Sequence, residues 1–233
     1  MLTFFDIPSS LSRAWSPNTW KVRYYLNYHR IPYRTQWIEL PLIESTCTSL
    51  GIPPSKVQPP STAYPEGHKA YTLPAVYDAT TNTYISESAR ILKYLDGRYP
   101  STTSAQAFPK GTSVVVPLWD VITPDIAKML NDESRVYFEE TRRAVFQGRT
   151  LAEGKNESWE KVNKGLADVG RKGQGVFVTG DKPVFSDFVI AATFAYMRNV
   201  WGEDHERWKE VLTWDNDRWA RFVDALREFE EVK

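Results

Sequence analysis

The chain has 233 residues, of which 42% are apolar and 25% are charged, a composition that excludes an intrinsically disordered protein. Its 29 Lys and Arg residues balance its 29 Asp and Glu residues, and it has no strongly basic run, so nucleic acid is excluded as a partner. The single cysteine, Cys47, excludes an internal disulfide, a cysteine-rich metal site and a CxxC redox pair.

The first residues show no basic leader followed by an apolar stretch, and no run of apolar residues is long enough to span a bilayer. We therefore expect a cytoplasmic protein that is neither secreted nor inserted in a membrane. The three histidines, His29, His68 and His205, are far apart and lack the spacing of metal ligands, so no metal is expected.

The first hundred residues predict a mixed α/β domain. A β-rich run over 2–7, a helical pattern over 17–30 and alternation over 33–38 form a β-α-β unit with parallel strands. After a proline-rich stretch over 41–72, which holds at most a short helix at 43–50, the chain resumes regular structure. The predicted elements there are strands at 73–78 and 83–85, joined as a hairpin, and a helix over about 87–99.

The second half predicts helices only. Residues 101–111 have the small polar composition of a linker, which divides the chain into domains at 1–100 and 112–233. Amphipathic helical patterns follow at about 113–146, 156–171, 185–200, 204–212 and 215–230.

Ser16 directly precedes Pro17 where the first helix begins. One interpretation is a plain helix cap, because serine is favoured at the N-cap and proline at the first helical position. The other is functional, because a hydroxyl and the free N–H groups of a helix N-terminus stabilise an anion, including a thiolate.

Two further segments have a plain and a functional interpretation. Pro74 either tolerates the start of an edge strand or forms a cis bond with Leu73 that presents backbone groups. Either Ser86 caps the third helix and Glu87 complements its dipole, or Glu87 and Ser88 bind the ammonium and carboxylate of an amino-acid head group.

The order and spacing of these three segments within one β-α-β-β-β-α frame resemble the glutathione S-transferase superfamily, which has a thioredoxin-like N-terminal domain and an all-α C-terminal domain. The resemblance implies that Ser16 meets the sulfur of glutathione as the catalytic residue. It implies that Leu73 and Pro74 pair with the cysteinyl backbone, and that Glu87 and Ser88 bind the γ-glutamyl group. The partner of the glycine carboxylate stays open among Lys56, His68 and Lys69.

The segment FVTGDKPVFSDFVIAA at 177–192 resembles the family's entry into the core helix of the second domain, with Asp187 at the characteristic acid. The hydroxyl residue that normally caps this helix falls at Val184, so the capping box is incomplete. We therefore expect Asp187 to be structural rather than catalytic.

The stretches SPNTWKVRYYLNYHRIPY, GIPP at 51–54 and YTLPAV resemble the fungal-specific, serine-type transferases related to bacterial β-etherases. This resemblance implies a homodimer, a role in detoxification, and acceptors that are apolar or aromatic. The reaction is expected to be conjugation, or cleavage of an ether or peroxide. Five aromatic residues are candidate walls of the acceptor pocket: Trp15, Phe108, Trp119, Tyr196 and Trp201.

Two other functions stay open. The nine tryptophans also suit a ligandin-type carrier that binds aromatic or phenolic compounds without turnover. A third interpretation is a structural or regulatory relative that has lost glutathione binding.

Overall fold

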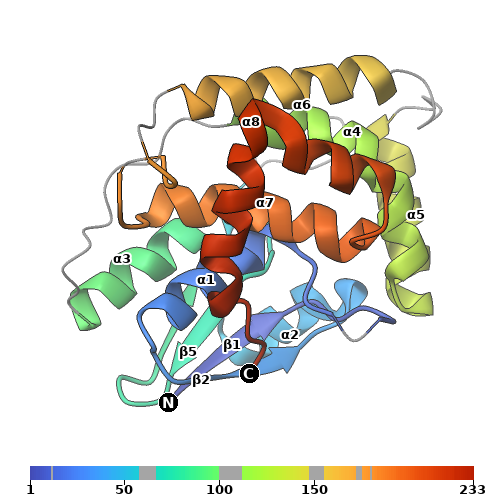
Figure 1. Ribbon diagram of the computed structural model, residues 1–233. Helices are drawn as coiled ribbons and strands as arrows, with labels where there is room; N and C mark the ends of the chain where they lie inside the picture. Colours follow the sequence, from blue (N-terminus) through green and yellow to red (C-terminus); the bar gives the residue numbers. More distant parts are fainter. Residues whose placement is uncertain (12, 58–66, 100–111, 147–154, 172–174, 179) are drawn as a thin grey trace.

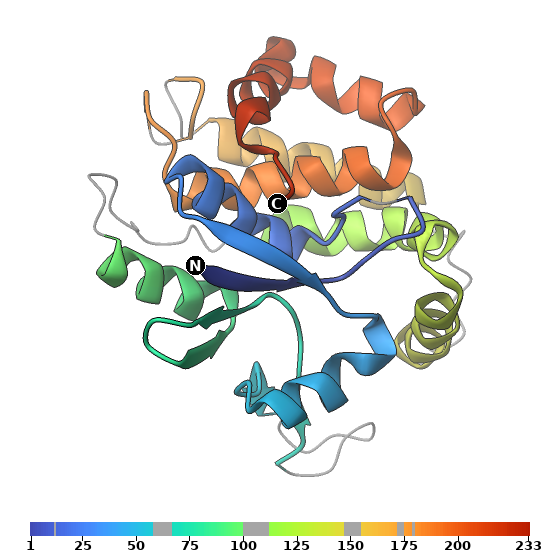
Figure 2. The same cartoon turned by 90° about the horizontal axis from the view of Figure 1, so that it is seen from below.

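The computed structural model describes residues 1–11, 13–57, 67–99, 112–146, 155–171, 175–178 and 180–233. A mixed α/β half is followed by a helical half that packs against the helices on one side of the sheet (Figures 1 and 2). The expected linker at 101–111 lies outside the described residues. Within them, no helix is long and apolar enough to cross a membrane.

The first half follows the predicted order of strands and helices. Its elements are β1 (Leu2–Asp6), α1 (Pro17–Tyr28), β2 (Tyr33–Trp37), the 3-10 helix η1 (Leu40–Leu42), α2 (Ile43–Leu50), β3 (Lys56–Val57), β4 (Lys69–Ala70), β5 (Ala75–Asp78), β6 (Thr83–Ser86) and α3 (Ser88–Arg98). The strands β3 and β4 were not predicted. Each has only two residues, too few to show alternation, and prolines flank the ribbon that they form.

The four-stranded sheet has the order β2-β1-β5-β6, in which β1 is parallel to β2, as predicted, and antiparallel to β5. In its register Phe5 pairs with Ala75, and Ala75 pairs with Ser86. The end of β1, the start of β5 and the end of β6 therefore lie in one row. The loop that leads to α1, the segment before β5 and the start of α3 all meet at this end of the sheet.

The second half contains α4 (Thr112–Met129), α5 (Asp132–Phe146), α6 (Lys155–Gly170), α7 (Phe185–Trp201), α8 (Glu206–Leu226) and the 3-10 helix η2 (Arg227–Phe229). The stretch predicted over 113–146 is two helices, which separate at Leu130 and Asn131. The helical dihedral angles of α8 are interrupted at Trp214–Asp217. This break agrees with the two separate stretches predicted there.

Helix α7 joins the two halves, since it packs along α1 and is largely buried (Figure 1). The ring of Phe188 lies 6.2 Å from that of Tyr24, 6.4 Å from that of Tyr25 and 5.4 Å from that of Tyr28. Three tyrosines of α1 thus enclose one phenylalanine of α7, and the two halves share a single aromatic core.

The start of α7 shows how the missing capping hydroxyl is replaced. The buried carboxylate of Asp187 accepts hydrogen bonds from the backbone N–H of Val184 at 3.0 Å and of Val178 at 2.7 Å. Asp187 therefore completes the acidic half of a capping box and also holds the preceding segment against the helix. This geometry is structural.

Candidate functional site

Ser16 occupies the N-cap of α1 in an extended conformation, with Pro17 at the first helical position. Its carbonyl accepts hydrogen bonds from the N–H of Trp20 at 3.1 Å and from Oγ1 of Thr19 at 3.0 Å. Its hydroxyl makes no capping hydrogen bond, although the residue stands where a cap belongs. Only 5% of Ser16 is exposed, so an anion bound to this hydroxyl is largely shielded from water.

The peptide bond between Leu73 and Pro74 is cis, and both residues are buried. Strand β5 begins only at Ala75, so Leu73 stands just outside the sheet ladder. Because Ala75 pairs with Phe5, this dipeptide lies beside the end of β1, from which the chain continues towards Ser16.

The third predicted segment begins α3. Ser88 is the first helical residue and Glu87 is the N-cap, with a positive φ of 72° that is unusual for a residue other than glycine. Non-glycine residues in such conformations cost of order 1 kcal/mol and concentrate at functional sites. The Glu87 side chain makes no capping bond, and Ser86 ends β6 instead of capping the helix. The prediction that Ser86 caps the helix is therefore wrong, whereas Glu87 does stand at the N-terminus of α3, where its charge complements the helix dipole.

Lys21, one turn into α1, was missed by the sequence analysis. Burial lowers the pKa of its ammonium group below the ordinary value, and the negative charge of Glu87 opposes this shift. Its Nζ also donates a hydrogen bond to Asn18 at 2.8 Å. A cation from α1 and a carboxylate from α3 thus act on each other at the predicted site. The only signal in the sequence was a lysine one turn after Ser16.

The candidates for the glycine carboxylate all lie on the ribbon of β3 and β4. Lys56 pairs with Ala70, and Lys69 pairs with Val57. Both lysines are exposed and His68, just before β4, is half-buried. Lys56 and Lys69 belong to neighbouring pairs of the ladder, so their side chains leave opposite faces of the ribbon, and the ribbon singles out none of the three residues.

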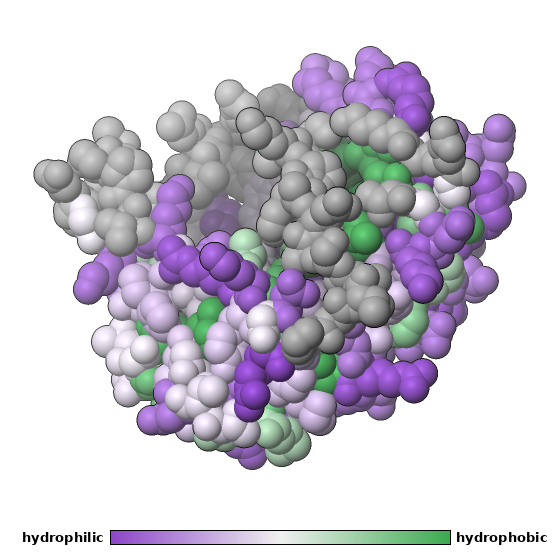
Figure 3. Space-filling view, turned by 90° about the vertical axis from the view of Figure 1, so that its left-hand side faces the viewer, coloured by the Kyte–Doolittle hydropathy of each residue, from purple (hydrophilic) through white to green (hydrophobic). Residues whose placement is uncertain are grey.

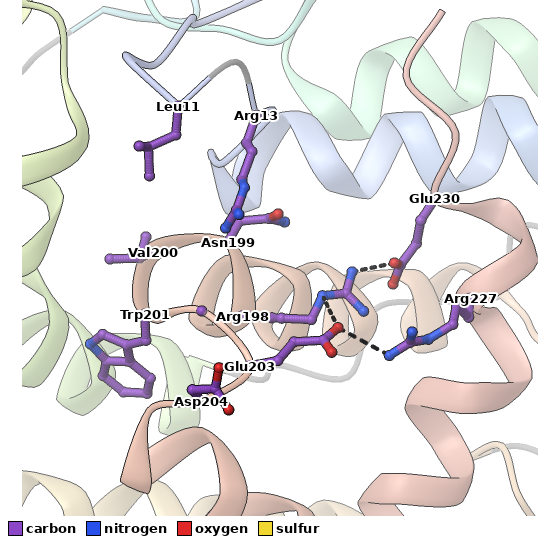
Figure 4. A pocket seen from close by; sticks show the side chains of 11 residues that line it. Leu11, Arg13, Arg198, Asn199, Val200, Trp201, Glu203, Asp204, Arg227 and Glu230 are labelled. Carbon is purple, nitrogen blue, oxygen red and sulfur yellow. Dashed lines mark hydrogen bonds and ion pairs between the residues drawn. The ribbon is translucent and has the colours of Figure 1, made fainter.

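The five aromatic candidates for the acceptor pocket do not form one wall. Trp15 and Tyr196 pack on each other with ring centroids 6.4 Å apart, and both are core residues with 4% and 2% exposure. Trp119 is half-buried. Trp201, the last residue of α7, lines a cleft between the end of that helix, the loop after β1 and the segment after α8 (Figure 4). Phe108 lies outside the described residues.

Arg142 of α5, also missed from the sequence, connects two of these aromatic residues. Its guanidinium carbon lies 5.2 Å from the ring centre of Trp119. Burial raises the pKa of the Tyr196 hydroxyl well above its ordinary value, and the charge of Arg142 opposes this shift. Trp119 of α4, Arg142 of α5 and Tyr196 of α7 therefore form an aromatic and cationic cluster. Through Tyr196 this cluster contacts Trp15, which precedes Ser16 in the chain.

Family models match both halves of the chain. Residues 15–98 match the N-terminal domain of glutathione S-transferases, and residues 105–229 match their C-terminal domain. The chain belongs to the glutathione S-transferase family. Its sheet and helices are the thioredoxin-like domain and the helical domain of that family, as the sequence predicted.

Individual members of the glutathione S-transferase family resemble the whole chain. The glutathione S-transferase-like protein ustS of Aspergillus flavus is 30% identical, over 92% of this chain and 86% of its own. The crystal structure of glutathione transferase GSTFuA3 from Phanerochaete chrysosporium has a TM-score of 0.88 and 33% identity, over 100% of this chain and 98% of its own. That of CsGST63524 of Ceriporiopsis subvermispora, in complex with glutathione, has a TM-score of 0.87 and 32% identity, with the same coverage. All three of these relatives come from fungi.

Proposed function

We propose that this protein is a serine-type glutathione transferase in which the hydroxyl of Ser16 donates a hydrogen bond to the sulfur of glutathione. One observation carries the proposal: the pairing of Phe5 with Ala75 and of Ala75 with Ser86 gathers all three predicted segments at one end of the sheet. The unengaged cap position of Ser16 supports it, since the hydroxyl makes no capping bond to its own helix.

Glutathione lies extended along this end of the first domain. The backbone of Leu73, just outside the ladder of β5, pairs with the cysteinyl residue, while Glu87 and Ser88 bind the ammonium and carboxylate of the γ-glutamyl group. The positive end of the α3 dipole favours that carboxylate. The crystallised complex of CsGST63524 with glutathione supports glutathione as the co-substrate.

The proposed mechanism requires stabilisation of the thiolate. The pKa of a free thiol is about 8.5, and lowering it by two units takes about 2.7 kcal/mol of differential stabilisation. A hydroxyl donor and the N-terminus of α1 together supply an effect of this size. The thiol proton leaves to solvent, and the sulfur then forms its bond to the electrophile as the leaving group departs. Ser16 forms no covalent bond.

The helical domain binds the second substrate, with residues 1–100 for glutathione and 112–233 for the acceptor. Apolar or aromatic electrophiles suit the Trp119 and Arg142 cluster, whose cation also favours oxygen-bearing leaving groups. The reactions in keeping with this site are conjugation and the cleavage of ethers or peroxides. We further propose a homodimer, by analogy with the serine-type fungal class.

The test is a titration of bound glutathione by the ultraviolet absorbance of its thiolate, in the wild type and in Ser16→Ala. We expect the apparent thiol pKa to rise by about one unit in the variant, because the N-terminus of α1 still acts on the sulfur, with a corresponding loss of turnover near neutral pH. Ser49→Ala, on the exposed face of α2, is the matched control and should leave both unchanged. An unchanged thiol pKa in Ser16→Ala would overturn the assigned role.

Thermal-shift titration of the wild type with glutathione, flavonoids and electrophiles, beside activity assays, separates the competing functions. Saturable binding of aromatic compounds without turnover of any electrophile favours a carrier. Failure to bind glutathione favours a structural or regulatory relative.

A further inference from the structure

The segment with the cis bond between Leu73 and Pro74 belongs to neither of the sheets that the structure describes. β4 ends at Ala70 and β5 begins only at Ala75. The surface on the side where α3 lies mixes hydrophilic with hydrophobic residues, so its character alone does not mark the course of a bound peptide (Figure 3). That course depends on how residues 71–74 are held, and contacts other than a strand ladder must hold them.

The hydroxyl of Ser55 takes the place of a neighbouring strand beside Thr72. Its Oγ accepts hydrogen bonds from the N–H of Thr72 at 2.9 Å and from Thr72 Oγ1 at 2.7 Å, and it donates to the carbonyl of Thr72 at 3.2 Å. A hydroxyl has one donor and two acceptor lone pairs, so this oxygen uses all of its capacity on one residue. The N–H of Ser55 also donates to the carbonyl of Ala70 at 2.9 Å. These contacts extend the ribbon of β3 and β4 to the residue before Leu73.

Ser55 is itself held firmly, because the stretch GIPP at 51–54 leads to it from α2. Gly51 ends the helix in the left-handed region, with a φ of 72°, and the N–H of Ile52 donates to the carbonyl of Cys47 at 2.8 Å. Ile52 is buried, and two prolines with fixed φ angles follow it. Ser55 is only 8% exposed. The physical role of this stretch is therefore to place one hydroxyl.

The bond from Ser55 to the carbonyl of Thr72 also fixes the residue that follows. That carbonyl and the N–H of Leu73 belong to one peptide group, which is planar and trans, so the two point in opposite directions. Ser55 therefore sets the direction of the Leu73 N–H, which points away from the Ser55 hydroxyl. Leu73 stands just outside the ladder of β5, where this N–H can meet a bound peptide.

We propose that Ser55 is a positioning residue for glutathione, which orients the peptide between Thr72 and Leu73 so that the N–H of Leu73 donates to the cysteinyl carbonyl of the substrate. This inference rests on the proposed function, in which the backbone of Leu73 pairs with the cysteinyl residue. Ser55 touches neither glutathione nor the electrophile. Its loss should therefore weaken the binding of glutathione and leave the ionisation of the sulfur at Ser16 unchanged.

Calorimetric titration with glutathione tests the proposal in Ser55→Ala. We expect the dissociation constant to rise roughly tenfold, because the peptide before Leu73 loses the group that orients it. Thr72→Val, at an exposed position, is the matched control: it removes one donor but keeps both backbone bonds to Ser55, so the constant should stay within about twofold of the wild type. Ser55→Cys keeps the shape of the side chain but bonds more weakly, so its constant should lie between those of the wild type and Ser55→Ala. Circular dichroism checks that the variants fold.

Two further measurements separate positioning from a merely structural role. γ-Glutamylcysteamine has the thiol and the γ-glutamyl group of glutathione but no cysteinyl carbonyl, so it should bind the wild type and Ser55→Ala equally. The thiol pKa of bound glutathione, measured at saturation, should also be the same in both.

The outcomes distinguish this inference from the proposed function. An unchanged dissociation constant for glutathione in a folded Ser55→Ala or Ser55→Cys variant, or an equal loss of affinity for γ-glutamylcysteamine, would refute the positioning role and leave the role of Ser16 standing. An unchanged thiol pKa in Ser16→Ala refutes the role of Ser16 and leaves the positioning role of Ser55 to be decided by the two affinities.

Discussion

A serine hydroxyl can stabilise a thiolate but cannot form a disulfide with it, so the choice of Ser at position 16 restricts the chemistry of the site. The plain capping function that competes for this residue is not fulfilled by its side chain. Its place at the start of α1 remains, and the N-terminus of a helix favours an anion.

Replacing Ser16 with cysteine should therefore change the reaction class. A thiol at a helix N-terminus has a lowered pKa and attacks disulfides, so we expect Ser16→Cys to gain thiol–disulfide exchange at least roughly tenfold above the wild type. Conjugation activity should fall. The measurement is glutathione-dependent reduction of hydroxyethyl disulfide, with Ser49→Cys as a surface control. A folded Ser16→Cys variant with no gain over that control would place the glutathione sulfur elsewhere.

Tyr196 is a second buried hydroxyl at the residue scale. Among the described residues it has no hydrogen-bond partner, and an unsatisfied buried polar group costs about 1–3 kcal/mol. We expect Tyr196→Phe to raise the free energy of unfolding by about 1 kcal/mol, measured in urea. Tyr24→Phe is the counterpart, because Tyr24 donates to Glu230 at 2.7 Å, and it should lower that free energy. A loss of stability in Tyr196→Phe would contradict the expectation.

Asp78, at the end of β5, makes stability depend on pH. Burial alone would raise the pKa of its carboxyl, but hydrogen bonds from Thr80 and Tyr94, together with the charge of Arg98, hold it below the ordinary 3.8. A lowered folded pKa stabilises the protein above pH 3.8, and this contribution is lost as the pH falls through the folded value. Asp78→Asn should therefore be less stable than the wild type near neutral pH, with the difference vanishing in acid. Thermal unfolding across pH measures this, with the exposed Asp181→Asn as control; a difference that persists in acid would argue against the carboxylate.

At the scale of elements, β1 and α1 are joined by a buried ion pair that the sequence did not reveal. Arg23 and Asp6 are both fully buried and lie 2.6 Å apart. The guanidinium also donates to Tyr33 and Thr35 of β2, and the ring of Phe4 lies 4.9 Å from its carbon. One cation thus connects three elements of the β-α-β unit.

Breaking this pair from one side should be costly. Arg23→Met leaves an uncompensated buried carboxylate, and the expected loss in the free energy of unfolding is about 3–5 kcal/mol. The double variant Asp6→Asn, Arg23→Met should recover part of the loss, because no isolated charge remains. Urea denaturation of both variants measures the coupling. If the double variant is less stable than Arg23→Met, the loss of stability in Arg23→Met does not come from the unpaired carboxylate of Asp6.

At this scale the sequence could predict those elements whose pattern depends only on residues close together in the chain. Alternation and helical spacing predicted β1, α1, β2 and the β5-β6 hairpin, because each side chain's environment there follows from its own element. Arg23 and Trp15 could not be placed in this way. Helical spacing puts Arg23 beside both polar and apolar neighbours, and only packing between elements shows that it is buried and that Trp15 belongs to the core. The positions of Ser16, Leu73 and Glu87 were predictable as motifs, whereas their meeting at one end of the sheet required the register.

At the scale of the whole molecule, the end of the chain returns to the first domain. After η2, Nδ2 of Asn27 on α1 donates to the carbonyls of Phe229 at 2.7 Å and Glu231 at 2.8 Å. The N–H of Thr35 on β2 donates to the carbonyl of Lys233 at 2.8 Å. Because β2 is an edge strand, this segment covers part of an edge that is otherwise open to pairing with other chains (Figure 2).

Removal of residues 229–233 should therefore have two effects. The loss of these three hydrogen bonds, each worth about 1 kcal/mol, and of the bonds from Tyr24 and Arg198 to Glu230, should lower the free energy of unfolding by more than about 3 kcal/mol. Exposure of the β2 edge should also promote association, visible as increased light scattering on storage. Removing only residues 232–233 is the graded control, since it loses the bond to Thr35 but keeps both bonds to Asn27, and should cost about 1 kcal/mol. Equal stability of the two shortened chains in urea would show that Asn27 does not hold the segment, and the returning chain would then serve to cover the strand edge alone.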